Sequence, residues 1–256
     1  MSLDFTFRKY EELCKSIKKT KYPVLRIKDY FENESLKKFV ILRHDVDKLP
    51  ENALAMAQLE NVMGLKSTYY FRTTPDVFKY EIITQISELG HEIGYHYETL
   101  TRSKGNLEKA LKLFEKDLER LNKITKISTI SMHGSPLSKW NNIDIWKKYD
   151  FKKYGIIGDP LLSINYKDIG YFSDTGRTWL NKGSVRDFVK NSLKHKEKIK
   201  STNDLMRFIH TKEFKKLIIL IHPQRWSLKS SKWLKELIAQ NIKNIGKDLI
   251  LKRREK

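Results

Sequence analysis

Apolar residues recur along this chain in two alternating patterns, one with helical spacing and one of short continuous runs. The helical spacing predicts helices over 6–19, 51–62, 77–89, 106–121 and 203–210, and another around Trp233 to Ile242. The apolar runs predict strands near 22–27, 39–44, 66–72, 91–96, 127–132, 153–157, 170–172 and 217–221. The run 217–221 is apolar throughout, which indicates burial on both faces of a sheet.

From residue 39 to residue 132 the predicted strands and helices alternate. This order is typical of a parallel sheet covered by helices, either open or closed into a barrel. The expected class is therefore α/β with mainly parallel strands, and its chemistry should collect on the loops at the carboxyl ends of the strands.

The chain has 256 residues and a mass of 30.4 kDa, with no linker rich in Gly, Ser or Pro and no repeat of fixed period. We expect one domain over 1–256, in which 1–35 form an N-terminal extension of helix and strand packed on the barrel. The single Cys14 excludes an intramolecular disulfide and a cysteine cluster for zinc. The N-terminus lacks the layout of a signal peptide, so a cytoplasmic location is expected.

The formal charge is +20, from 51 Lys and Arg against 31 Asp and Glu. Such a chain attracts polyanions: nucleic acid, anionic lipid head groups, acidic glycans or nucleotide-linked sugars. The lysines are spread along the chain, and we find no signature of a helix-turn-helix, zinc finger or RNA-recognition module, so nucleic-acid binding is not expected. No window is long and apolar enough for a membrane span, which leaves peripheral membrane contact open. The pattern does not indicate an oligomeric state.

Two acids close the apolar run 39–42, within Arg43-His44-Asp45-Val46-Asp47. In an extended chain Asp45 and Asp47 point to the same face, where two nearby carboxylates repel unless a cation or proton lies between them. The segment therefore indicates metal binding or proton transfer. The alternative is a solvated loop, or a helix cap before Pro50.

Four histidines lie at or just past the predicted carboxyl ends of strands: His44, His96, His133 and His222. Imidazoles and carboxylates gathered at one rim suit Zn²⁺, Ni²⁺ or Co²⁺. His96 is the strongest ligand candidate, whereas His133 is either part of the site or a polar residue that opens a Gly/Pro turn. His222 precedes Pro223, so it is either a positioned general acid or a packed turn residue.

Three further residues carry two interpretations each. Asp174 either orients a histidine or holds a cation in an outer shell, or it caps a turn. Trp179 and Trp226 either stack on sugar faces or are packed aromatics.

These residues resemble the motifs of the polysaccharide deacetylases of the NodB-homology type, carbohydrate esterase family four. Arg43 to Asp47 is similar to the family's acidic strand end, with one residue between the acids. Gly90-His91-Glu92-Ile93-Gly94 followed by His96 is similar to its second motif, and Ile219-Leu220-Ile221-His222 to its last. The anchors occur in family order between 39 and 226.

The resemblance implies a deformed (β/α) barrel that hydrolyses an N- or O-acetyl group on a sugar with a divalent metal. It implies that Asp45 is the base, that Asp47 and His96 bind metal and that His222 is the acid, although Val46 leaves an exchange between the two acids open.

The chain departs from the family at two places. The second metal histidine would stand at position 100, which is Leu100, so Glu98 or His133 completes the shell or the site binds metal weakly or not at all. The Arg of the third motif is missing from Met132-His133-Gly134-Ser135-Pro136, so Arg43 or Arg225 would replace it.

These departures resemble the branch found among surface-polysaccharide and O-antigen biosynthesis proteins. The expected substrate is an acetylated sugar or glycan precursor, lipid-linked or nucleotide-linked. The alternative is a catalytically inactive carbohydrate-binding or scaffold protein that kept the fold.

Overall fold

The computed structural model describes residues 3–33, 35–179, 199–211 and 213–227. Its strands are β1 (Val24–Leu25), β2 (Phe39–Val46), β3 (Thr68–Phe71), β4 (Glu92–Tyr97), β5 (Ile130–Met132), β6 (Ile169–Ser173) and β7 (Lys216–Ile221). Its α-helices are α1 (Phe7–Lys19), α2 (Ile27–Glu32), α3 (Pro50–Val62), α4 (Tyr80–Glu88), α5 (Thr99–Arg102), α6 (Leu107–Asn122), α7 (Pro160–Ser163) and α8 (Thr202–Thr211). Short 3-10 helices are η1 (Asn142–Lys147), η2 (Phe151–Tyr154), η3 (Tyr166–Asp168) and η5 (Pro223–Arg225).

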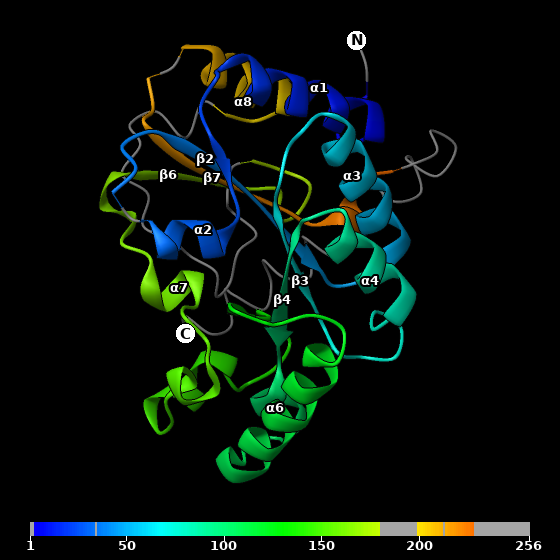
Figure 1. Ribbon diagram of the computed structural model, residues 1–256, viewed down its shortest axis with the longest axis vertical. Coiled ribbons are helices and arrows are strands. Elements are labelled where there is room, and N and C mark those ends of the chain that lie inside the picture. Colours follow the sequence, from blue (N-terminus) through cyan, green and yellow to red (C-terminus); the bar gives the residue numbers. More distant parts are fainter. Residues whose placement is uncertain (1–2, 34, 180–198, 212, 228–256) are drawn as a thin grey trace, which may run out of the picture.

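The strands form one sheet in the order β5-β4-β3-β2-β7-β6, and every pairing within it is parallel. β1 also pairs in parallel, with the start of β2. The sheet is curled and helices surround it, with α1 and α8 at one end, α3 and α4 along one side and α6 at the other end (Figure 1). The expected deformed (β/α) barrel of mainly parallel strands is confirmed.

The side-chain alternation of β2 divides the buried residues between the two faces of the sheet. Val40 and Leu42 pack on the outer face with residues of α1, α3 and α8, such as Tyr10, Met56 and Leu205. Phe39 and Ile41 point to the inner face, where they meet Tyr70, Tyr171, Ile218 and Leu220. The same alternation sends Arg43 and Asp45 inward and His44 outward.

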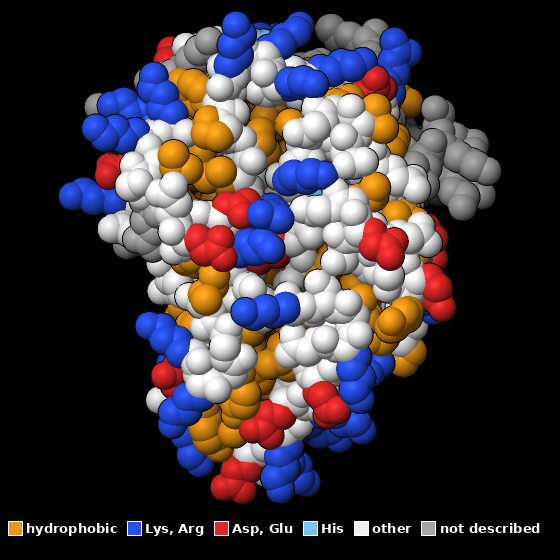
Figure 2. Space-filling view, in the orientation of Figure 1, with side chains coloured by type: hydrophobic (Ala, Val, Ile, Leu, Met, Phe, Trp, Pro, Cys, Tyr) orange, Lys and Arg blue, Asp and Glu red, His pale blue; other side chains and the backbone are white. Residues whose placement is uncertain are grey.

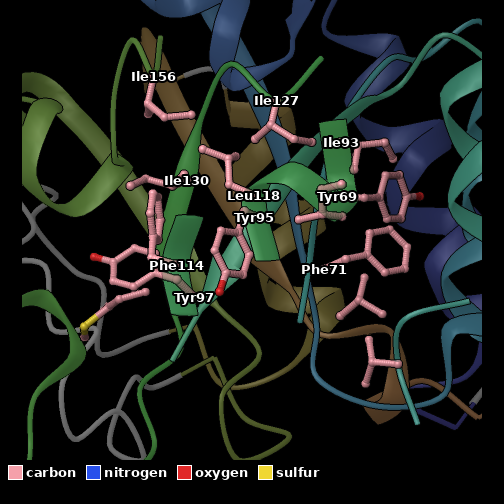
Figure 3. Close-up of a cluster of buried hydrophobic side chains, with 14 of the residues drawn as sticks. Tyr69, Phe71, Ile93, Tyr95, Tyr97, Phe114, Leu118, Ile127, Ile130 and Ile156 are labelled. Atoms are coloured by element: carbon pink, nitrogen blue, oxygen red, sulfur yellow. The ribbon is translucent and has the colours of Figure 1, made fainter. Parts of the chain in front are cut away.

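A second outer cluster fixes the direction of β4. Ile93, Tyr95 and Tyr97 pack with residues of α6 such as Phe114 and Leu118. Figure 3 shows these rings and aliphatic chains gathered over β3, β4 and β5. Because residues 93, 95 and 97 point outward, His96 points to the inner face that it shares with Asp45.

The structure corrects two expectations and does not test a third. Residues 153–157 do not form a strand, since Phe151–Tyr154 is a 3-10 helix that ends at Gly155 with φ 73°. The strand expected over 22–27 has only two residues, and the helix α2 follows it directly. The helix expected around Trp233 to Ile242 lies outside the described residues.

Candidate active site

The acids of β2 lie at its carboxyl end, in two different environments. Asp45 is fully buried and forms a two-pronged ion pair with Arg43, with Nε–Oδ1 at 2.9 Å and Nη2–Oδ2 at 2.8 Å. Arg43 Nη2 also donates to Ser131 Oγ at 2.6 Å, and its guanidinium lies 5.2 Å from the centre of the Tyr70 ring. A Cβ at position 94 would lie 2.3 Å from that ring, so only Gly94 leaves room for it.

Asp47 is the acid that the imidazoles face. His96 Nε2 lies 3.3 Å from Asp47 Oδ1 and His133 Nε2 lies 3.6 Å from the same oxygen. His96 Nε2 is also 3.6 Å from Asp45 Oδ2. The other oxygen of Asp47 accepts from Gln224 Nε2 at 2.9 Å. Among the described residues, Oδ1 has no hydrogen-bond partner although it is buried.

The opposite nitrogens of these imidazoles explain why Oδ1 receives no hydrogen bond. His96 Nδ1 lies 3.0 Å from the Ser131 carbonyl oxygen, which only accepts, so Nδ1 carries the proton. His133 Nδ1 lies 3.0 Å from Glu98 Oε2 and 3.0 Å from Ser135 Oγ. In the neutral rings each Nε2 therefore presents a lone pair toward Asp47. As long as both rings are neutral, a carboxylate oxygen and two imidazole lone pairs converge there without a donor between them.

The carboxylates around this point favour positive charge, either a protonated imidazole or a bound cation. Burial by itself would lower the pKa of His96, but Asp45 and Asp47 outweigh it and raise that pKa above its ordinary value. Burial would raise the pKa of Asp47, but His133 and His96 hold it well below the ordinary value. The pKa of Asp45 is also lowered, because Arg43 and the nearby imidazoles outweigh the effect of burial.

His222 and Asp174 form a separate dyad beside Asp47. Asp174 follows β6, and its Oδ1 accepts from His222 Nδ1 at 2.6 Å while its Oδ2 accepts from the His222 backbone N–H at 2.9 Å. Arg225 and Trp226 donate to the same carboxylate at 3.2 Å and 2.8 Å. Burial would raise the pKa of Asp174, but His222 and Arg225 lower it overall, so Asp174 stays ionised.

Five of the residues that the sequence analysis proposed for the site lie together in the structure. Asp45, Asp47, His96, His133 and His222 share one rim, which we call the rim cluster. Asp174 and Arg225 lie behind His222, Arg43 lies behind Asp45, and Glu98 contacts His133 instead of Asp47. Asp47 and His133 are the most accessible, each with 18% of its side chain exposed, so the cluster opens to solvent beside them.

His44 is not part of the rim cluster, which corrects the expectation that four histidines meet there. Its Nε2 lies 2.7 Å from Glu60 Oε1 on the outer face of β2, and both side chains are fully buried. Tyr10, Tyr69, Ser67 and His91 surround the same carboxylate. Adjacent residues of a strand point to opposite faces, so His44 and Asp45 cannot both face the site.

Trp179 and Trp226 are fully buried, so the expectation that they stack on a sugar is wrong for this structure. Trp179 Nε1 donates to Thr202 Oγ1 at 3.0 Å, and Trp226 Nε1 donates to Asp174. Both rings also pack against Phe5. Trp226 therefore supports the dyad from within the core.

Sequence reasoning missed Arg72, Gln224 and Ser131. Arg72 directly follows β3, the same position relative to its strand that singled out the histidines, so that rule would have found it. Ser131 lies on the inward parity of β5, opposite His96 in the parallel pairing. Nothing in the pattern distinguishes Gln224, whose contact with Asp47 depends on the turn after His222.

The chain matches no known protein-family model, and no curated protein sequence is significantly similar to it. Among solved structures it is similar to a family 4 carbohydrate esterase pseudoenzyme from Bacillus anthracis, at 14% identity and a TM-score of 0.46, over 82% of this chain and 61% of that one. This chain thus spans less than two thirds of the pseudoenzyme's length.

Two catalytic proteins show a similar likeness. One is the catalytic domain of a peptidoglycan N-acetylglucosamine deacetylase from Eubacterium rectale, at 16% identity and a TM-score of 0.45, over 81% of this chain and 85% of that one. The other is a family 4 carbohydrate esterase from Streptococcus mutans, at 13% identity and a TM-score of 0.45, over 90% of each chain. Likenesses at this level do not establish an activity.

Proposed function

We propose that this chain is a metal-dependent hydrolase that removes an acetyl group from an acetylated sugar. The observation that carries the proposal is Asp47 Oδ1, which is buried without a hydrogen-bond partner among the described residues and faces two imidazole nitrogens. Buried polar atoms are almost always paired, so an unpaired carboxylate oxygen beside two ring lone pairs suits a bound cation. The motif resemblance described above leads to the same chemistry.

Asp47, His96 and His133 would hold the ion. Two ligands of a tetrahedral Zn²⁺ lie roughly 3.3 Å apart, given bonds of about 2.0–2.1 Å. The separations of 3.3 Å and 3.6 Å from Asp47 Oδ1 are close to that value. As the side chains stand, no group of three His, Cys, Asp or Glu residues in the described part of the chain has the geometry of a metal site, so these side chains would have to close around the ion. When bound, the ion supplies Lewis-acid activation of the acetyl carbonyl and of water.

Asp45 and His222 would move the protons. Asp45 is ionised because Arg43 holds it as a carboxylate, and its Oδ2 is the basic atom on the side of His96. It would take a proton from the attacking water as the new C–O bond forms. His222 would give the Nε2 proton to the leaving nitrogen or oxygen as the old bond breaks, while Asp174 holds its Nδ1–H and stabilises the imidazolium.

The substrate class and location belong to the same proposal. We infer a glycan precursor, lipid-linked or nucleotide-linked, used in cell-surface polysaccharide biosynthesis in the cytoplasm. Within the described residues, no helix has the length and apolarity to cross a bilayer. Lys and Arg side chains are scattered with acidic ones over the face in Figure 2 instead of forming a single patch.

The test is acetate release from N-acetylated and O-acetylated sugars after addition of Zn²⁺, Ni²⁺ or Co²⁺. Asp45→Asn and His96→Ala should each abolish release. Asp168→Asn, just before the start of β6, and His210→Ala, near the end of α8, change exposed residues and should leave it unchanged. Acetate release that persists in both rim variants would contradict the mechanism.

A second candidate is a catalytically inactive carbohydrate-binding or scaffold protein. It is favoured by the burial of Asp45, whose two oxygens both bind Arg43, and by Leu100 at the position of the missing histidine. Elemental analysis separates the two candidates. One tightly bound ion per chain supports the hydrolase, whereas a metal-free protein that binds glycans supports the scaffold.

A further inference from the structure

A second buried ion pair lies at the rim, and the chemistry described above does not use it. Arg72, just after β3, binds Glu98, just after β4, through contacts of 2.7 Å, 2.9 Å and 3.1 Å. Their side chains are only 16% and 7% exposed. Arg72 Nη1 also donates to the Asp47 backbone carbonyl at 3.1 Å. The pair thus connects the loop of Asp47 to the end of β4.

Glu98 also contacts the ring of His133. Its Oε2 lies 3.0 Å from His133 Nδ1, while its two-pronged contact with Arg72 keeps it ionised and able only to accept. In the neutral ring, the Nδ1 of His133 therefore carries the proton, and Nε2 presents a lone pair toward Asp47 Oδ1 at 3.6 Å. Carboxylates that receive the second N–H of a metal-binding histidine orient the ring in this way in many metal sites.

The His133 loop is built to hold that ring. The backbone N–H of His133 donates to the Tyr97 carbonyl at 2.8 Å, and its carbonyl accepts from Asn142 Nδ2 at 2.8 Å. Ser135, with φ 40°, folds its hydroxyl back to 3.0 Å from His133 Nδ1. A left-handed backbone at a non-glycine residue costs about 1 kcal/mol or more and persists where surrounding contacts impose it.

Position 100 cannot perform this task. Leu100 is buried in the outer apolar cluster beside β4 and α6, on the side of the sheet away from Asp47. A ligand from the start of α5 is therefore replaced by one from the loop after β5, and the replacement requires an acceptor for Nδ1. Glu98 is the charged acceptor at that point.

We propose that the Arg72–Glu98 pair is a positioning element that makes His133 the third metal ligand, with Arg72 holding Glu98 and Glu98 fixing the tautomer and direction of the His133 ring. The inference rests on the proposed function. Glu98 itself does not bind the metal and does not touch the substrate.

The tautomer of His133 tests the proposal without metal or turnover. Nitrogen-15 NMR of the metal-free protein should show His133 with its proton on Nδ1, and Glu98→Ala should move the proton to Nε2 or mix the two forms. Glu98→Gln retains an accepting oxygen and should preserve the Nδ1 form in part. Glu119→Ala, an exposed change on α6, is the control. An unchanged His133 spectrum in Glu98→Ala overturns the proposal.

A double-mutant cycle on metal affinity separates positioning from direct binding. Zn²⁺ competition titrations and Co²⁺ absorption spectra should show a loss of roughly 10–100-fold for Glu98→Ala, as is typical of outer partners of metal ligands. In a His133→Ala background, Glu98→Ala should cost nothing further, because Glu98 acts through the ring that is already gone. Equal losses in both backgrounds would show that Glu98 is itself a ligand and overturn the proposal.

The outcomes also separate this inference from the proposed function. A protein that binds metal with a non-additive cycle but releases no acetate refutes the hydrolase and supports the positioning role. An active hydrolase with an additive cycle refutes the positioning role alone. A wild-type protein that binds no divalent ion in these titrations refutes both.

Discussion

Two buried clusters on opposite faces of β2 both contain carboxylates and histidines, but they differ in how many hydrogen bonds the central carboxylate accepts. In the Glu60 cluster, formed by Glu60 with Tyr10, His44, Ser67, Tyr69 and His91, one carboxylate accepts on both oxygens: Tyr10 and His44 bind Oε1, and Ser67 and Tyr69 bind Oε2. In the rim cluster, Asp47 Oδ1 accepts from none of the described residues although two imidazoles face it. In the Glu60 cluster, the buried side-chain atom without a partner among the described residues is His44 Nδ1, which is on a ring and not on the carboxylate.

The difference shows what separates a structural cluster from a reactive one. Carboxylates and histidines occur in both, so residue type does not distinguish them. Hydrogen-bond donors reach both oxygens of Glu60. Burial would raise its pKa, but the charge and hydrogen bond of His44, with His91 and Ser67, lower it to about 2. No described residue donates to Oδ1 of Asp47, which leaves that atom available to a ligand.

The largest expected effect is on activity, from Asp47→Asn. The change should remove metal binding and lower kcat/KM by about 10³–10⁴-fold, which corresponds to about 4–5 kcal/mol of transition-state stabilisation. The free energy of unfolding of the metal-free protein should fall less than in Glu60→Ala. The amide oxygen still accepts from Gln224 and Oδ1 has no hydrogen-bond donor to lose among the described residues, so only the attraction to His133 and His96 is removed. Metal titration and urea denaturation measure the two effects. A large loss of stability without loss of metal would reverse the assignment of the clusters.

Glu60→Ala should act in the opposite way. It leaves the hydroxyls of Tyr10, Tyr69 and Ser67 and the ring of His44 buried without an acceptor, so we expect a loss of about 4 kcal/mol in the free energy of unfolding. The metal affinity of the fraction that stays folded should be unchanged. Chemical denaturation of Glu60→Ala beside Glu119→Ala provides the measurement and its control. Metal binding that is weakened as much as in Asp47→Asn would show that the two faces are coupled.

The pH dependence of stability follows from the same carboxylate. The pKa of Glu60 is lowered from 4.5 to about 2 in the folded protein, so its stabilisation is present above pH 4.5 and is lost as the pH falls toward 2. The full loss is about 3 kcal/mol. Glu60→Gln should flatten the curve of unfolding free energy against pH in this range, relative to wild type. Parallel curves for the two proteins would mean that Glu60 is not ionised in the fold.

The smallest effect is expected for Trp179→Phe. The change removes the hydrogen bond from Nε1 to Thr202, so a loss of about 1 kcal/mol in unfolding free energy is expected. Because the ring is fully buried, KM for any sugar should stay the same. A raised KM with unchanged stability would restore Trp179 as a substrate-binding residue.

The sequence predicts the fold better than it predicts the site. Alternating apolar periods are sufficient for the order of strands and helices from β2 to β5, because each pattern spans many residues and tolerates errors of one or two. They fail at residues 153–157, where Tyr154, Ile156 and Ile157 suit a strand but Gly155 in left-handed geometry ends a 3-10 helix. A segment of only five residues is too short to distinguish the helical spacing of apolar residues from that of a strand.

The site depends on individual side-chain contacts, which the spacing of apolar residues does not predict. The expectation that site residues follow the carboxyl ends of strands brings Asp47, His96, His133 and His222 to one rim. It also includes His44, because β2 is buried on both faces and its sequence does not show which residues point inward. Tautomers depend on the carbonyl of Ser131 and the carboxylate of Glu98, which are separated from their histidines by 35 positions each in the chain. Those pairings exist only after the sheet has formed.

The alternation of β2 also limits how this protein can change over evolutionary time. Deleting or inserting one residue between Val40 and Arg43 would exchange the environments of His44 and Asp45, so the imidazole would enter the barrel and the acid would meet Glu60. Both clusters would fail together, one by losing its base and the other by acquiring a like charge. We therefore expect length variation among relatives of this chain to be confined to the loops that flank the strand, while the strand itself keeps its residue count.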